Sequence, residues 1–179
     1  MATFEIQKES STVNWTGKKV LGLHTGTINI SRGQIDINNG KIDGSEVVID
    51  MTSLSVTDIS DPQTLQEFRN HLWSDDFFSI DNYRTSSLKI EHGELVGDNE
   101  YKLRGQLTIK DITRPVTFRA KIEILTDFLY STGELQIDRT LYNIRYGSGK
   151  FIDNLGDKLI HDEFVLQFKI IGQRGSNCG

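Results

Sequence analysis

Residues 103–124 read LRGQLTIKDITRPVTFRAKIEI and contain two runs in which apolar and polar side chains alternate. The apolar or small positions of the first run are Leu103, Gly105, Leu107 and Ile109. Those of the second run are Val116, Phe118, Ala120, Ile122 and Ile124. Alternation with a period of two is typical of a strand with one buried face. This stretch therefore predicts two half-buried β-strands.

The same alternation recurs along the chain and gives about eight strand candidates in all. Turn signals such as Asn39-Gly40 and Ser131-Thr-Gly133 separate several of the runs. A chain with 16 glycines and only 2 prolines suits many tight turns and a continuous sheet. One polar face per strand favours an antiparallel sheet with one side in water. We therefore expect an all-β sandwich or an up-and-down barrel. The other runs begin near Val13, His24, Val47, Leu88, Leu135 and Phe164.

One segment, residues 61–73, follows a helical pattern instead. Its apolar residues Leu65, Phe68 and Leu72 recur at a spacing of three to four, which predicts a helix with one apolar face. Asp61 suits the N-cap, and Pro62 suits the first helical position. No linker separates a second domain, so we expect one domain over residues 1–172. Residues 173–179 are expected to form a disordered tail.

Composition excludes several classes of function. A formal net charge of -5 without a basic block argues against nucleic-acid binding. The one cysteine, Cys178, cannot form an internal disulfide or a thiolate metal site. No apolar run approaches the roughly 20 residues that span a bilayer, so stable membrane insertion is not expected. Residues 1–6 do not resemble a signal peptide. We expect a cytoplasmic protein, or a periplasmic one if a leader has been removed.

The histidines give no catalytic or metal-binding motif. None of the four has a second histidine at ligand spacing, and no nucleophile elbow or phosphate loop is present. His24 shares a strand face with Ile28, and His71 lies one step off the apolar stripe of the helix. A buried, hydrogen-bonded histidine is more frequent at such positions than a metal ligand. We therefore expect no catalytic residues, no metal and no cofactor.

Two aromatic groups each allow two interpretations. Phe77 and Phe78 follow the helix and could either plug a solid core or line the cavity of a barrel. The segment from Arg139 to Tyr146 is rich in tyrosine and arginine. Tyr142 and Tyr146 could pack across strands, or they could form a polar mouth around a ligand head group. Periodicity alone does not separate a lined cavity from a packed core.

Several ordered motifs together carry a resemblance to a known family. They are Gly22-Leu-His-Thr-Gly-Thr-Ile28, Val47-Val-Ile-Asp50, Ser74-Asp-Asp-Phe-Phe78, Gly105-Gln-Leu-Thr-Ile-Lys110, Ile112-Thr-Arg-Pro-Val116, Asp138-Arg139 and Ile144-Arg-Tyr-Gly-Ser148. Their order and spacing resemble the YceI family of lipocalin-like, polyisoprenoid-binding proteins, from about Phe4 to Ile171. The chain departs from the family pattern at Arg84, where a proline is usual, and at Leu88.

The resemblance implies an antiparallel eight-stranded, lipocalin-like barrel with an inserted helix capping one end. It implies binding, storage or transport of a long isoprenoid-like lipid, such as an isoprenoid quinone or a polyprenyl phosphate. Family members are not established enzymes as a class, are often exported to the periplasm and are often dimeric, which leaves a homodimer open. By motif, the family's histidine falls on His24, its lid on Leu72, Asp76, Phe77 and Phe78, and its late arginine on Arg139.

The candidate ligand-binding residues combine these motifs with the strand faces. The apolar candidates are Trp15, Ile28, Ile49, Phe68, Leu72, Phe77, Phe78, Leu107, Phe118 and Phe168. The polar candidates are His24, His71, Arg139, Tyr142 and Tyr146. A shift of one residue in register would turn any strand candidate outward. Three alternatives remain open: an enzyme acting on the bound lipid, a stress-response module with a solid core, and a fatty acid or fatty amide as ligand.

Overall fold

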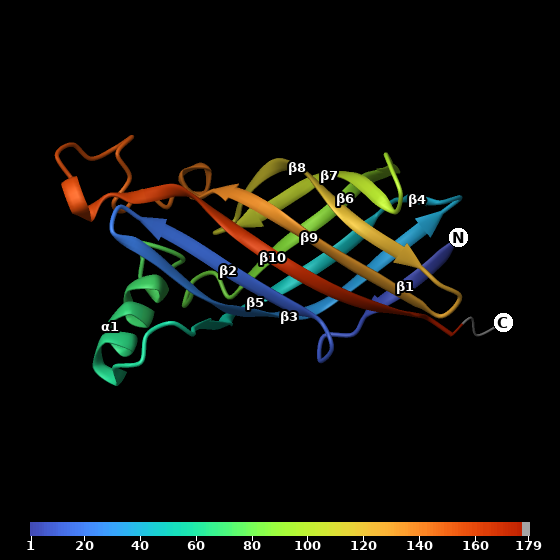
Figure 1. Cartoon of the computed structure of the whole chain (residues 1–179), viewed down its shortest axis with the longest axis horizontal. Coiled ribbons are helices and arrows are strands. Elements are labelled where there is room, and N and C mark those ends of the chain that lie inside the picture. The colour runs from blue at the N-terminus through green and yellow to red at the C-terminus, as the bar shows by residue number, and fades with distance from the viewer. Residues whose placement is uncertain (177–179) are drawn as a thin grey trace.

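A computed structural model describes residues 1–176 and shows a continuous antiparallel sheet with an α-helix at one end (Figure 1). The strands are β1 (Ala2–Ile6), β2 (Thr12–Lys19), β3 (Gly22–Asn38), β4 (Lys41–Ile42), β5 (Ser45–Val56), β6 (Thr85–Leu95), β7 (Glu100–Ile109), β8 (Ile112–Ile124), β9 (Phe128–Asp138) and β10 (Ile160–Arg174). The helix is α1 (Pro62–Trp73). Two 3₁₀ helices, η1 (Arg139–Tyr142) and η2 (Gly156–Lys158), lie between β9 and β10.

Eight of these strands form a closed ring, because β10 pairs with β9 on one side and with β2 on the other. The order around the ring is β2, β3, β5, β6, β7, β8, β9 and β10. The short strand β1 pairs with β10 and β3, and β4 pairs with β3 and β6. This ring confirms the predicted eight-stranded antiparallel barrel with a helix at one end.

Strands β7 and β8 form a tight hairpin from the stretch with the clearest alternation. Leu103 lies opposite Phe118, and the pairing continues to Ile109 opposite Ile112. The two turn residues have left-handed backbone angles, with φ of 53° at Lys110 and 59° at Asp111. Positive φ at both central residues is the geometry that matches the right-handed twist of paired strands.

Two strand glycines allow neighbouring backbones to approach closely. A Cβ atom at Gly26 would lie 1.8 Å from the carbonyl oxygen of Ser55. A Cβ atom at Gly105 would lie 1.9 Å from the carbonyl oxygen of Lys89. Both distances are far below van der Waals contact, so glycine is required where these strands bend around the ring.

A capping hydrogen bond marks the start of helix α1. Asp61 is the N-cap, and its carboxylate accepts a hydrogen bond from the Thr64 N–H at 2.9 Å. Leu72 is buried, whereas Leu65 and Phe68 are half-buried, so one face of the helix packs on the end of the barrel. No helix within residues 1–176 is long and apolar enough to cross a membrane.

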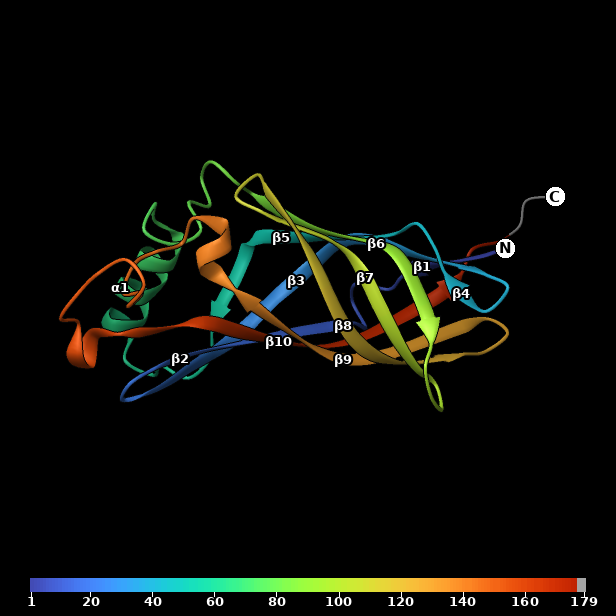
Figure 2. The same ribbon diagram turned by 90° about the horizontal axis from the view of Figure 1, so that it is seen from above.

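The two ends of the barrel differ, and we call them the α1 end and the β1 end (Figures 1 and 2). The β1 end holds the N-terminus and is tightly packed. Phe4 and Leu129 are 0% exposed there, and Ile42 is 2% exposed. The α1 end holds the helix and the segment between β9 and β10, which both lie at the left of the two views.

The last strand extends further than the sequence predicts. Strand β10 continues to Arg174, whose N–H donates to the carbonyl of Asp127. The Arg174 guanidinium also lies 5.5 Å from the centre of the Phe4 ring. The strand therefore ends two residues beyond the predicted domain boundary at residue 172. Cys178 and the rest of 177–179 lie outside the described residues.

Candidate ligand-binding site

Part of the inner wall of the barrel is only half-buried. Its half-buried apolar side chains pack against the fully buried core and include Val47, Ile49, Leu88, Val116, Phe118, Phe164, Leu166 and Phe168. Protein interiors are normally close-packed, so large inner side chains that stay partly accessible mark space that no protein atom fills. The half-buried stretch of wall lies between the buried residues of the β1 end and the buried residues under the lid, among them Phe77 and Ile80.

Two phenylalanines on the strands that flank β9 meet on the half-buried inner wall. The rings of Phe118 and Phe168 meet edge to face, with centroids 6.1 Å apart. Gly133 lies opposite Phe168, and a Cβ atom there would come within 2.6 Å of the Phe168 ring. The absence of a side chain at Gly133 thus makes room for the Phe168 ring.

The wall opens beside this pair of rings because β8 and β9 separate. Their pairing runs only from Ile124–Leu129 to Ala120–Gly133. Beyond that point β8 stays paired with β7, and β9 stays paired with β10, as Figure 2 shows. A cleft of about 460 Å³ lies at the divergence and is lined by Phe168, Gly133 and several charged residues. Solvent can reach the half-buried inner wall at this place.

Aromatic contacts connect the helical lid with the barrel strands. Phe78, which follows α1, meets Phe164 of β10 edge to face at 6.3 Å. Phe68 of the helix lies against the ring of His24 at 4.5 Å. The lid, formed by α1 and the residues that follow it, therefore contacts β3 and β10 through aromatic side chains.

His24 carries a carboxylate partner at the edge of the lid. Its Nδ1 lies 2.9 Å from Oδ2 of Asp58, and the other carboxylate oxygen accepts the Thr25 N–H at 3.1 Å. Burial alone would raise the pKa of Asp58. The hydrogen bonds from Thr25 and His24 outweigh burial and hold that pKa below its ordinary value. The pair places a fixed polar group beside the apolar lid.

His71 forms a second histidine–carboxylate pair on the helix itself. Its Nε2 lies 3.1 Å from Oδ2 of Asp76. The ring meets Phe77 at 4.9 Å and Tyr146 at 4.4 Å, both edge to face. Through Tyr146 the helix contacts the segment between η1 and β10, so His71 joins two parts of the lid.

Arg139 is 4% exposed, and its guanidinium N–H groups donate hydrogen bonds to backbone carbonyls. Nε donates to His161, Nη1 to Ile144 and Nη2 to Ile160, at 3.0, 2.9 and 3.2 Å. Burial lowers the pKa of Arg139, whereas the charges of Asp162 and Asp138 act in the opposite direction. These bonds fasten the β9–β10 segment to β10. A head-group contact by Arg139 stays a prediction.

The two candidate tyrosines lie in different environments. Tyr142 is 1% exposed, and burial raises the pKa of its hydroxyl. Tyr146 is exposed and covers His71 and Phe77 from outside. The structure therefore places one tyrosine within the protein and the other on the lid surface, rather than side by side at a mouth.

The predicted site residues other than Tyr142 fall into two groups by position. Those at the lid are His24, Phe68, His71, Leu72, Phe77, Phe78, Arg139 and Tyr146. Those in the strands of the barrel are Trp15, Ile28, Ile49, Leu107, Phe118 and Phe168. Trp15 is additionally fixed by its indole N–H, which donates to the carbonyl of Ser55 at 2.9 Å. Their contact with a ligand stays a prediction.

Sequence reasoning missed four residues that shape this end of the molecule. Phe164 and Leu166 share the strand face of Phe168, so alternation contained the signal for them. Asp58 and Lys110 had no such signal. Lys110 is buried and donates from Nζ to the carbonyl of Asn143 at 3.1 Å. Burial lowers its pKa, and the charge of Asp75 opposes that effect.

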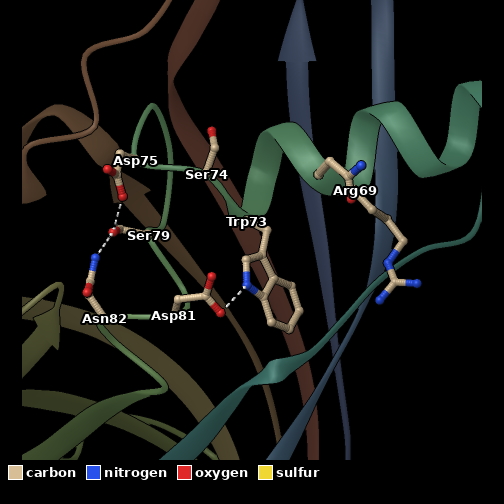
Figure 3. A pocket seen from close by; sticks show the side chains of 8 residues that line it. Arg69, Trp73, Ser74, Asp75, Ser79, Asp81 and Asn82 are labelled. Carbon is tan, nitrogen blue, oxygen red and sulfur yellow. Dashed lines mark hydrogen bonds between the residues drawn. The ribbon is translucent and has the colours of Figure 1, made fainter.

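A polar cleft of about 670 Å³ lies beside the C-terminal end of α1 (Figure 3). Trp73 donates to Asp81 at 3.1 Å, and Asn82 donates to Ser79, which in turn donates to Asp75. Its polar groups are therefore largely paired with one another. Across residues 1–176, no cluster of three or more His, Cys, Asp or Glu side chains could hold a metal ion.

Comparison with known proteins agrees with this architecture. The family model of the YceI-like domain matches residues 4–171. BcnA from Burkholderia cenocepacia is 21% identical with a TM-score of 0.74, over 93% of this chain and 98% of its own. A polyisoprenoid binding domain from Saccharophagus degradans, implicated in plant cell wall breakdown, is 16% identical with a TM-score of 0.67, over 96% and 98%.

A third similar structure is the YCEI protein of Campylobacter jejuni. It is 18% identical with a TM-score of 0.63, over 80% of this chain and 81% of its own. No curated protein matches the sequence. Likenesses at these levels of identity establish the fold alone.

Proposed function

This chain belongs to the YceI-like family, and on that premise we propose that it binds one isoprenoid-like lipid and stores or transports it. The lipid chain occupies the half of the barrel next to α1. The description of the Saccharophagus relative as a polyisoprenoid binding domain supports this ligand class. The proposal is for binding without chemical conversion of the lipid.

The half-buried inner wall is the observation that carries the proposal. A protein whose barrel served only as a scaffold would gain stability by filling it with side chains. Here the inner side chains Val116, Phe118 and Phe168 remain half-buried, whereas Phe4 and Leu129 at the β1 end are sealed. An apolar chain of limited length fits a chamber along this wall.

The energetics suit a long hydrocarbon chain. Burying each methylene is worth roughly 0.8 kcal/mol, so a few isoprene units offset the cost of ordering the ligand. Such a chain has no polar groups to satisfy and needs only apolar walls. Its polar head group would lie at the α1 end, where the pairs His24–Asp58 and His71–Asp76 supply hydrogen-bonding groups.

Native mass spectrometry of the purified protein, followed by solvent extraction, tests this function. We expect one lipid per chain, recovered with its mass unchanged after incubation with the protein. A protein that carries no lipid and binds no prenyl probe at micromolar concentration would contradict the proposal. If the extract contained mainly straight-chain fatty acids, the ligand would be a fatty acid and not an isoprenoid.

Two neighbouring substitutions locate the chamber. Val116→Trp adds a large ring on the inner face and should reduce uptake of a prenyl probe at least tenfold, a loss of about 1.4 kcal/mol. Thr117→Trp adds the same ring one residue away, on the exposed outer face, and should leave uptake unchanged. Circular dichroism confirms that both variants are folded. Equal uptake by the two variants would place the lipid outside the chamber.

A further inference from the structure

The geometry points to a membrane-docking surface at the α1 end, by which the protein meets an anionic lipid bilayer. We call it the tip surface and define it by the exposed apolar residues Val20, Leu21, Leu23, Phe151 and Ile152. This inference rests on the proposed function, because a lipid carrier must exchange its lipid with a membrane.

The tip surface is built from two segments that lie side by side. Val20 and Leu21 come from the turn between β2 and β3, Leu23 comes from the start of β3, and Leu21 is 71% exposed. Phe151 and Ile152 come from the segment between η1 and β10, and Phe151 is 48% exposed. The Val20 N–H donates to the Leu159 carbonyl at 3.3 Å and ties the segments together. Both views place them at the α1 end.

The charges around these residues are predominantly positive. Residues 18–23 hold two lysines and no acidic residue. Residues 143–159 hold three basic and two acidic residues, Asp153 and Asp157. The basic residues of the two segments are Lys18, Lys19, Arg145, Lys150 and Lys158. Lys150 is paired with Asp138 and Asp162. The side chains of Lys18, Lys19 and Lys158 are exposed. The Arg145 guanidinium lies 4.5 Å from the centre of the Phe151 ring.

The β1 end provides an internal comparison because it also exposes apolar side chains. Leu95, Val96, Leu125 and Phe128 lie there, in the β6–β7 and β8–β9 turns or at the strand ends beside them. Residues 94–100 and 123–128 contain five acidic residues and no basic one. Exposed apolar residues are therefore common to both ends, whereas the two segments of the tip surface hold more basic than acidic residues and the turns of the β1 end hold only acidic ones.

A bilayer containing anionic lipid is the partner that fits this combination. Apolar side chains enter the headgroup and acyl boundary, and each lysine near an anionic surface adds attraction. Such a membrane attracts the lysines of the tip surface and repels the acidic turns of the β1 end. Docking in this orientation brings the α1 end to the membrane.

Co-sedimentation of the whole protein with vesicles tests this inference. The vesicles contain phosphatidylcholine alone or phosphatidylcholine with about a third phosphatidylglycerol. We expect binding to the anionic vesicles only, weakened by added salt. Lys18→Glu with Lys19→Glu, and separately Leu21→Ser with Phe151→Ser, should each reduce binding by about tenfold or more.

The matched control is Leu95→Ser with Leu125→Ser at the β1 end, which should bind vesicles like the unmodified protein. The inference would be overturned by any of three results. They are loss of vesicle binding in this control, vesicle binding by a tip variant equal to that of the unmodified protein, and no vesicle binding by the unmodified protein. A tip variant that altered the oligomeric state and left vesicle binding intact would identify a second copy as the occupant. Native mass spectrometry of the same tip variants separates the two proposals, because their bound lipid should be unchanged.

Discussion

Arg139 is a buried cation whose partners are backbone carbonyls at both ends of the β9–β10 segment. Its side chain reaches Ile144 on one side and Ile160 and His161 on the other. We infer that Arg139 holds this part of the lid in place. Arg139→Met should leave these carbonyls without a partner and lower the free energy of unfolding by about 3 kcal/mol.

Urea denaturation measures this effect against Arg104→Met, a substitution at an exposed arginine on β7 that should change stability by at most about 0.5 kcal/mol. A loss below about 1 kcal/mol in Arg139→Met would show that Arg139 does not fasten the segment. It would then favour a role for Arg139 in contacting the ligand.

Asp58 links the stability of the lid to pH. Its pKa in the folded protein lies below the ordinary value of 3.8, because hydrogen bonds from Thr25 and His24 outweigh burial. A carboxylate with a lowered folded pKa stabilises the fold above its unfolded pKa, and this contribution disappears as pH falls through the folded pKa. Asp58→Asn should therefore lose less stability on acidification below about pH 4 than the unmodified protein.

Thermal unfolding at a series of pH values measures this difference, with the exposed Asp98→Asn as control. The control should follow the unmodified protein at each pH. Curves for Asp58→Asn and the unmodified protein that fall in parallel would show that the His24–Asp58 pair contributes nothing to the acid response.

The positions of single residues could be predicted where apolar side chains alternate along a strand. They could not be predicted where the hydrogen-bond partner is far away in the sequence. Alternation predicts Phe118 and Phe168 as inner residues, and the same pattern extends to Phe164. His24 was identified without Asp58, which lies 34 positions along the chain. No local pattern reports a pairing over that distance, because it depends on how the strands close into a ring.

At the level of elements, the β7–β8 turn is held in a left-handed conformation by non-glycine residues. Asp111 has φ of 59°, an angle that glycine adopts at no steric cost. Asp111→Gly should raise the free energy of unfolding by up to about 1 kcal/mol. Asp127→Gly, in the β8–β9 turn, should lower it, since positive φ is not required there. Urea denaturation of the two variants compares them, and destabilisation by Asp111→Gly would contradict the assignment of the turn.

Local signals predicted some elements well and others poorly. The N-cap at Asp61 and the proline at position 62 were sufficient to place the start of α1, because capping is a property of a few adjacent residues. The closure of the ring depends on β10 pairing with β2, whose residues are separated by most of the chain. Sequence alternation predicted strands and a family resemblance predicted the barrel, but neither predicted where β8 and β9 would separate.

The whole molecule is a barrel whose two ends differ. The β1 end is closed by Phe4, Ile42 and Leu129, and the α1 end carries the lid and the tip surface with its lysines, while part of the inner wall between them is half-buried. The sequence could not separate a packed core from a lined chamber, because the same alternation describes both. The half-buried inner side chains Phe118 and Phe168 are what favours the proposed chamber.

A crystal structure of the lipid-loaded protein tests the central claim most directly. The account predicts one continuous branched chain beside Phe118 and Phe168, with its head group toward α1 and its tail ending before Phe4 and Leu129. Density for the lipid in the polar cleft beside α1, in the β1 half or on the outer surface, with the chamber filled by side chains, would contradict it.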